Sequence, residues 1–98
     1  MARWIKSDGT EEEVHPAGRE FTNVELHNMV DGTLTGLTLT GRDQGGLFMF
    51  MDDEYSLKGK PVNQVATALL HHYQPRRYGH ITVCGDVVVA GIDETGDE

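Results

Sequence analysis

The segment "FTNVELHNMVDG", residues 21–32, constrains the fold most, because it specifies both ends of a helix. Thr22 lies three residues before Glu25, a spacing that predicts a capping box in which each side chain bonds the other residue's backbone N–H. Gly32 is expected to end the helix, because glycine readily takes the positive φ that follows a last helical turn. The segment therefore predicts an amphipathic helix of about two to three turns.

A second helix is predicted over residues 64–73, "QVATALLHHY". Its apolar residues recur at the spacing that places them on one face of a helix. Asn63 is expected to cap the first turn with its side-chain oxygen, and Pro75 is expected to end the helix.

The remaining apolar stretches predict strands. Residues 33–42 alternate threonine with leucine and lead through the turn residues 43–46 into the apolar stretch 47–51, which together predict a hairpin. Gly36 shifts the alternation by one residue, so a β-bulge is expected there. The other expected segments are a short strand at 2–6, a polar loop at 7–18 and one strand or broken hairpin at 80–92.

The resulting order of elements is β-α-β-β-α-β. This order predicts a single α+β domain over residues 1–92, with both helices on one face of a mainly antiparallel sheet. Ferredoxin-like domains have the same order of elements, which makes that strand arrangement an expectation as well. The acidic residues 93–98 are expected to form a flexible tail.

Composition limits the classes of function. The 98 residues suit one domain, 38% of them are hydrophobic, and no apolar run approaches the length of a membrane helix. Sixteen acidic residues against eight Lys and Arg give a net charge of -8, which lacks the basic footprint of direct nucleic-acid binding. The start of the chain has no apolar signal segment and Cys84 is the sole cysteine, so a cytoplasmic protein without disulfides is expected.

The acidic run Asp52, Asp53 and Glu54 follows the apolar stretch 47–51. Paired carboxylates can transfer protons or bind a hard cation such as Mg²⁺, so these three residues are secondary candidates for a binding site. A solvated strand end followed by a turn is the favoured interpretation, because no second acidic motif converges on them. The histidines and the cysteine lack the spacing of a zinc site, and no nucleophile elbow or phosphate loop is present. No metal, cofactor or enzymatic activity is therefore expected.

The segment "HHYQPRRYGH", residues 71–80, concentrates basic and aromatic side chains in an acidic chain. Arginine and tyrosine are the residue types that dominate interface hot spots, and they also bind phosphates. The segment is thus the leading candidate contact surface, for a protein or for an anionic small molecule. A polar helix-to-strand connection that happens to be basic is an equal alternative. The candidate binding residues are His71, His72, Tyr73, Arg76, Arg77, Tyr78 and His80.

Three segments, "ELHNMVDG", "FMFMDDEYSLKGKPVNQVATALL" and "ITVCGDVVVAG", resemble an uncharacterised family of small bacteriophage and mobile-element proteins. The resemblance covers most of residues 25–91. Its most specific part is "DDEYSLKGKPVNQVAT", which contains a D-D-E-x-x-L-x-G-x-P-x-N segment, and a final G-D-V-V-V strand closes the domain. The family is a domain of unknown function, so the resemblance implies no reaction and no catalytic residues. It implies a small non-structural phage protein made in the cytoplasm of an infected bacterial cell.

Three classes of function follow from the residues and the resemblance. The leading one is a small phage accessory protein that binds and modulates a bacterial host or defence protein. The second is a module that sequesters an anionic nucleotide or signal molecule, with a homo-oligomer building pockets between subunits. The third is an acidic DNA mimic that blocks a restriction enzyme. An enzyme is the least favoured class.

Overall fold

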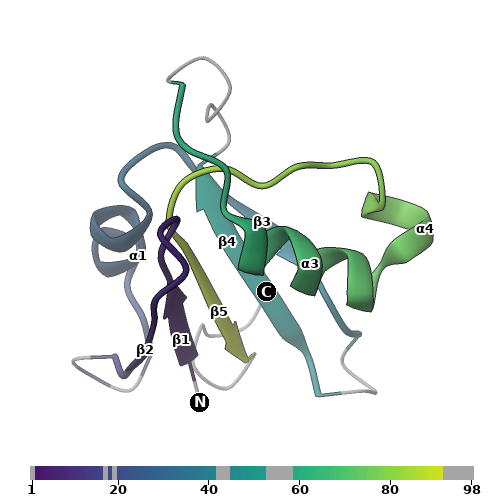
Figure 1. The fold of residues 1–98 in the computed structure, drawn as a ribbon. Helices are drawn as coiled ribbons and strands as arrows, with labels where there is room; N and C mark the ends of the chain where they lie inside the picture. The colour runs from purple at the N-terminus through teal and green to yellow at the C-terminus, as the bar shows by residue number, and fades with distance from the viewer. Residues whose placement is uncertain (1, 17, 19, 42–44, 53–58, 92–98) are drawn as a thin grey trace.

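Five antiparallel strands form one sheet in the order β2-β1-β5-β4-β3, and helices cover both of its faces (Figure 1). The structure is a computed structural model that describes all residues except 1, 17, 19, 42–44, 53–58 and 92–98. The elements in chain order are β1 (Ala2–Ile5), β2 (Glu11–Val14), α1 (Asn23–Val30), β3 (Leu34–Thr38), β4 (Leu47–Asp52), α3 (Gln64–Tyr73), α4 (Pro75–Tyr78) and β5 (Val87–Gly91).

The predicted α+β class and the antiparallel sheet are confirmed. β5 lies at the centre of the sheet between β1 and β4, and the β3–β4 hairpin extends the sheet on one side. Four consecutive residues of β5, Val87 to Ala90, are buried. Successive strand residues point to opposite faces, so a run of four buried residues requires cover on both faces.

Each face carries its own apolar cluster. Val87 and Val89 pack with Leu70 of α3 in one cluster. Val88 and Ala90 pack with Leu26 of α1 in the other. The prediction that both helices lie on one face is therefore wrong. The continuous apolar sequence of β5 is the reason, because a strand buried on one face alone would alternate apolar and polar residues.

Two further predictions of topology are corrected. Residues 11–14, placed in a loop by their acidic sequence, form β2 and pair with β1, with Ile5 opposite Glu11 and Ala2 opposite Val14. The ferredoxin-like arrangement is wrong, because it would place β1 between β4 and β5, whereas β5 lies between β1 and β4. The observed order has no split βαβ unit.

The first helix begins as predicted. The Thr22 side chain accepts a hydrogen bond from the Glu25 backbone N–H, and the Glu25 carboxylate accepts one from the Thr22 N–H at 2.9 Å. The helix end differs, because Asp31 and not Gly32 takes the left-handed conformation, with φ of 60°. Gly32 meets a different constraint: a Cβ at this position would lie 2.2 Å from the Asp52 carboxyl carbon.

The β3–β4 hairpin has an uninterrupted register from Leu34 opposite Asp52 to Thr38 opposite Phe48. The bulge expected at Gly36 is therefore absent. Gly36 faces the aromatic ring of Phe50, since a Cβ built on it would lie 3.2 Å from that ring. A glycine that shifts an alternating pattern can thus mark a close approach as well as a bulge.

The stretch 80–92, predicted as one strand or a broken hairpin, is a strand only from Val87 to Gly91. Before it, Cys84 forms an isolated bridge with Val62. The predicted tail at 93–98 lies outside the described residues. Among the described helices, none has the length and apolar character needed to cross a membrane.

Candidate functional site

The candidate segment 71–80 divides into side chains that hold the fold and side chains that face solvent. The partly buried His71 has its Nε2 atom 2.7 Å from the Ile81 carbonyl oxygen, which ties the end of α3 to the chain that follows α4. Tyr78 is also partly buried and packs against the apolar cluster beneath α3. These two residues position the segment.

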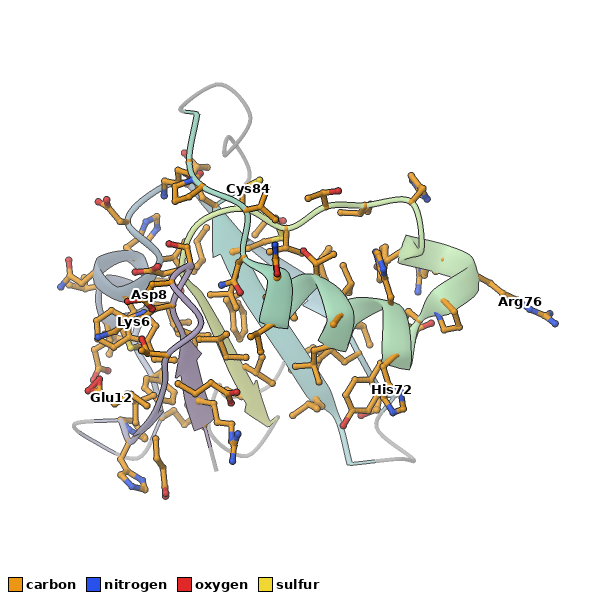
Figure 2. The ribbon with its side chains drawn as sticks, viewed as in Figure 1. Lys6, Asp8, Glu12, His72, Arg76 and Cys84 are labelled. Carbon is orange, nitrogen blue, oxygen red and sulfur yellow. The ribbon has the colours of Figure 1, made fainter. Side chains whose placement is uncertain are left out.

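The other candidate binding residues of the segment are exposed. The rings of His72 and Tyr73 lie edge to face with centroids 5.3 Å apart. The guanidinium carbon of Arg77 lies 5.6 Å from the centroid of the Tyr78 ring. Arg76 projects from α4 away from the rest of the molecule (Figure 2). The exposed residues of the segment's candidate set are His72, Tyr73, Arg76, Arg77 and His80.

Neither arginine has an acidic partner within the described part of the chain, where the ion pairs are formed by other cations. The two guanidinium groups therefore form a cationic projection on a chain with a net charge of -8. Pro75 opens α4 and the Gln74 side chain donates a hydrogen bond to the Leu39 carbonyl at 2.9 Å. These contacts fix the base of the projection.

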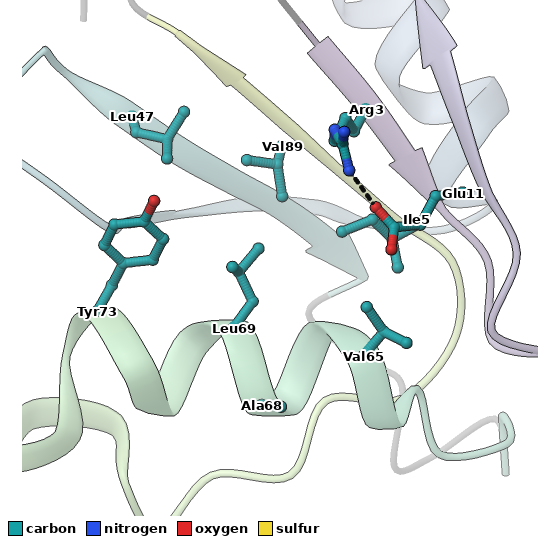
Figure 3. A pocket seen from close by; sticks show the side chains of 9 residues that line it. All are labelled: Arg3, Ile5, Glu11, Leu47, Val65, Ala68, Leu69, Tyr73 and Val89. Atoms are coloured by element: carbon teal, nitrogen blue, oxygen red, sulfur yellow. Dashed lines mark hydrogen bonds and ion pairs between the residues drawn. The ribbon is translucent and has the colours of Figure 1, made fainter.

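An apolar groove of about 580 Å³ lies between α3 and the sheet (Figure 3). Ile5, Leu47 and Val89 point into it from β1, β4 and β5. The α3 wall carries Val65, Ala68, Leu69 and Tyr73. Tyr73, which is 37% exposed, belongs both to the groove and to the basic segment, so the segment begins at one end of the groove. We call this surface, comprising the groove and residues 72–80, the α3–α4 surface.

The far rim of the groove is an ion pair between Arg3 and Glu11, with a nitrogen–oxygen distance of 2.6 Å. Their side chains are 63% and 36% exposed, so the pair contributes little to stability. The Arg3–Glu11 pair instead gives the apolar groove a charged end. The groove was not predicted from the sequence because its walls come from five elements. One of these, β2, which carries Glu11, was expected to be a loop.

The acidic run is only partly described, because Asp53 and Glu54 lie outside the described residues. Asp52 is 1% exposed, and its Oδ2 atom lies 2.9 Å from the Lys60 Nζ atom. Its Oδ1 atom accepts a hydrogen bond from the Thr33 N–H at 3.1 Å. The interpretation as a solvated strand end is thus wrong for Asp52. The Asp52 carboxylate forms a buried ion pair with Lys60, and this pair joins β4 to the segment that precedes α3.

The acidic strand β2 is partly neutralised by its neighbours. Glu11 pairs with Arg3, and Glu12 lies 3.8 Å from the Lys6 Nζ atom. Within the described residues, no group of three or more His, Cys, Asp or Glu side chains is close enough to hold a metal ion. The described features that a binding partner could contact are the apolar groove and the exposed arginines.

Comparison of the chain with protein-family models, with curated proteins and with solved structures finds no match. The resemblance to small phage proteins stays a prediction.

Proposed function

We propose that this protein is a small accessory protein of a phage or mobile element that binds and modulates a bacterial host or defence protein through its α3–α4 surface. The observation that carries the proposal is the exposed pair Arg76 and Arg77, which project from α4 with no acidic partner among the described residues. Arginine is enriched at interface hot spots because its planar guanidinium binds carboxylates in a fixed, bidentate geometry.

The groove supplies the apolar part of the contact. Interfaces combine a desolvated apolar centre with a polar rim. Leu69 and Tyr73 lie in the groove, and the arginines lie beyond Tyr73 along the chain. A partner with an apolar side chain next to an acidic patch would match both features. Such a patch would also complement the arginines electrostatically, which favours the correct orientation during association.

A second candidate function is the sequestering of an anionic nucleotide or signal molecule. The volume of the groove, about 580 Å³, favours it, because small-molecule sites commonly enclose about 300–1,000 Å³. Arg76, Arg77 and Tyr78 would then form the anion-binding rim. The lining of the groove is mainly apolar, which makes the protein partner the better match.

The test is affinity capture from bacterial lysate with the tagged protein at low and high salt, followed by mass spectrometry of the bound proteins. The wild-type chain should retain one partner in stoichiometric amount. The double variant Arg76→Ala, Arg77→Ala should lose at least about tenfold in affinity for it, since each hot-spot arginine is worth about 1 kcal/mol or more.

The matched control is Arg76→Lys, Arg77→Lys, which keeps both charges and removes the planar fork. Partial retention by this variant is expected if charge and geometry both contribute. Equal capture by wild type and by the alanine variant, with both folded, would overturn the proposal. Copurification of a nucleotide in place of a protein, seen as excess absorbance at 260 nm, would favour the second candidate.

A further inference from the structure

The two edges of the sheet differ in their protection against strand pairing. The edge strand β2 exposes three consecutive glutamates, Glu11 to Glu13. Charged residues on an edge strand discourage another chain from pairing with it. The opposite edge strand, β3, has the sequence Leu-Thr-Gly-Leu-Thr and no charged residue. The β2 edge is therefore protected by charge against pairing with another strand, and the β3 edge is not.

The outer side of β3 is open among the described residues. β3 pairs with β4 alone, and no other described strand lies beyond it. In an antiparallel pair, alternate residues direct their N–H and C=O groups toward the neighbour, so the intervening residues of β3 direct theirs outward. These outward groups can bond an added strand.

A groove of about 510 Å³ runs beside this edge, between α1 and the β3–β4 hairpin. Leu34, Phe48 and Phe50 contribute apolar side chains from the sheet, and Phe21 and Leu26 contribute them from α1 and its start. Gly36 lies on the same strand with its α-carbon exposed. A strand added to β3 would place every second side chain on the face of the sheet that carries this groove.

We propose that β3 binds an extended segment of a partner protein by β-strand addition, with alternate apolar side chains of that segment in the α1–β3 groove. The backbone bonds would supply affinity and the groove would supply selection of the side chains. This surface lies on the opposite face of the sheet from the α3–α4 surface, and the inference is independent of the proposed function.

The charge of the chain selects the kind of segment. The groove lining contains no charged residue, whereas the whole chain carries -8. A segment with lysine or arginine at the positions that point away from the groove would be attracted by this field. The occupant is therefore an alternating apolar and basic segment.

A second copy of this chain fits the edge less well. Two copies would bring together two chains of charge -8 each. Stable interfaces involve about 20–30 residues a side, and β3 offers five residues and the groove beside them. A linear segment needs no larger interface.

The test uses a fluorescent peptide in which valine alternates with lysine. Fluorescence polarisation and amide chemical shifts should report binding at β3 and α1. The decisive comparison uses two N-methylated versions of the peptide, each lacking the N–H donors along one of its edges. One version should bind like the parent, and the other should lose about tenfold or more in affinity, because it cannot donate to β3.

Thr38→Lys supplies the variant test, since Thr38 lies at the edge of the groove on β3. Its added charge should weaken binding of the basic peptide. Thr82→Lys is the matched control, because Thr82 is exposed and lies outside the groove. This control should bind like wild type.

Absence of peptide binding, or equal binding of both N-methylated peptides, would overturn strand addition. A wild-type dimer in sedimentation that Thr38→Lys converts to a monomer would assign the edge to a second copy and overturn the peptide as occupant. Arg76→Ala, Arg77→Ala should leave peptide binding unchanged. Failure of this inference is thus separable from failure of the proposed function.

Discussion

The Lys60 ammonium lies 2.9 Å from the buried Asp52 carboxylate and also donates hydrogen bonds to the carbonyl oxygens of Val30 and Asp31 at the end of α1. One side chain therefore ties together the end of a helix, the end of β4 and the segment before α3. The Lys60 side chain is 15% exposed and that of Asp52 is 1% exposed, so solvent screens the pair little.

Replacement of Lys60 by methionine should lower the free energy of unfolding by about 3 kcal/mol, because Asp52 would remain buried without its opposite charge. Urea denaturation measures this loss. Lys6→Met is the matched control and should cost at most about 1 kcal/mol, since Lys6 is a partly exposed residue that lies 4.3 Å from the Trp4 ring centroid. Equal losses in the two variants would show that the buried pair does not stabilise the fold.

Gly32→Ala should destabilise the protein although the φ of Gly32 is not positive. The new Cβ would lie 2.2 Å from the Asp52 carboxyl carbon, so the buried ion pair would have to shift. Overpacking of this kind costs about 1–3 kcal/mol. Gly18→Ala is the control, because nothing lies within 4 Å of its Cβ position. A thermal melt in which both variants match wild type would contradict the close approach.

Asn63 is fully buried and joins three segments. Its Oδ1 atom caps α3 by accepting from the Ala66 N–H at 3.0 Å, and its Nδ2 atom donates to the carbonyls of Ile5 and Gly85, both at 2.9 Å. Asn63→Ala should cost about 2–4 kcal/mol in urea denaturation, because the cap is lost and two buried carbonyls lose their donor.

Asn63→Asp separates the two roles of this side chain. It keeps an acceptor for the cap and removes both donors, so a stability near that of wild type would show that the cap alone matters. A loss comparable to that of the alanine variant is the expected result, because the carboxylate would face two carbonyl oxygens in a buried site.

Features encoded within a few residues were predictable from sequence. The capping box of Thr22 and the cap by Asn63 are confirmed, because each depends on hydrogen bonds that span three residues. The helix bounds follow from these caps. At the end of α1 the sequence prediction was wrong, because Asp31 and not Gly32 has the positive φ. Glycine is required at position 32 for a different reason, which is its close contact with Asp52 on a distant strand.

Features created by long-range pairing were not predictable in the same way. β2 has three consecutive glutamates and low β propensity, and only its register against β1 makes it a strand. The burial of Asp52 likewise depends on Lys60, which lies eight residues later in the sequence. The α3–α4 surface was half predicted: its basic segment is evident in the sequence, whereas its groove exists only once β1, β5 and α3 are assembled.

The turn between β1 and β2 gives a prediction about pH. Asp8 Oδ1 accepts hydrogen bonds from the Thr10 hydroxyl at 2.7 Å and from the Thr10 N–H at 3.0 Å. These bonds, that of the hydroxyl first, hold the pKa of Asp8 below its ordinary value, because they stabilise the carboxylate. Since the pKa is lowered in the folded state, any contribution to stability is present above the ordinary pKa and disappears as the pH falls through the lowered one.

Thr10→Val removes the hydroxyl and keeps the backbone donor, so the pKa of Asp8 should rise part of the way toward its ordinary value. An NMR titration of the Asp8 side-chain carboxyl carbon between acid and neutral pH measures the change. Thr82→Val is the control, since Thr82 is exposed and makes no hydrogen bond to Asp8. An Asp8 that titrates identically in wild type and Thr10→Val would show that the hydroxyl does not set its pKa, and would leave the N–H of residue 10 as the principal cause.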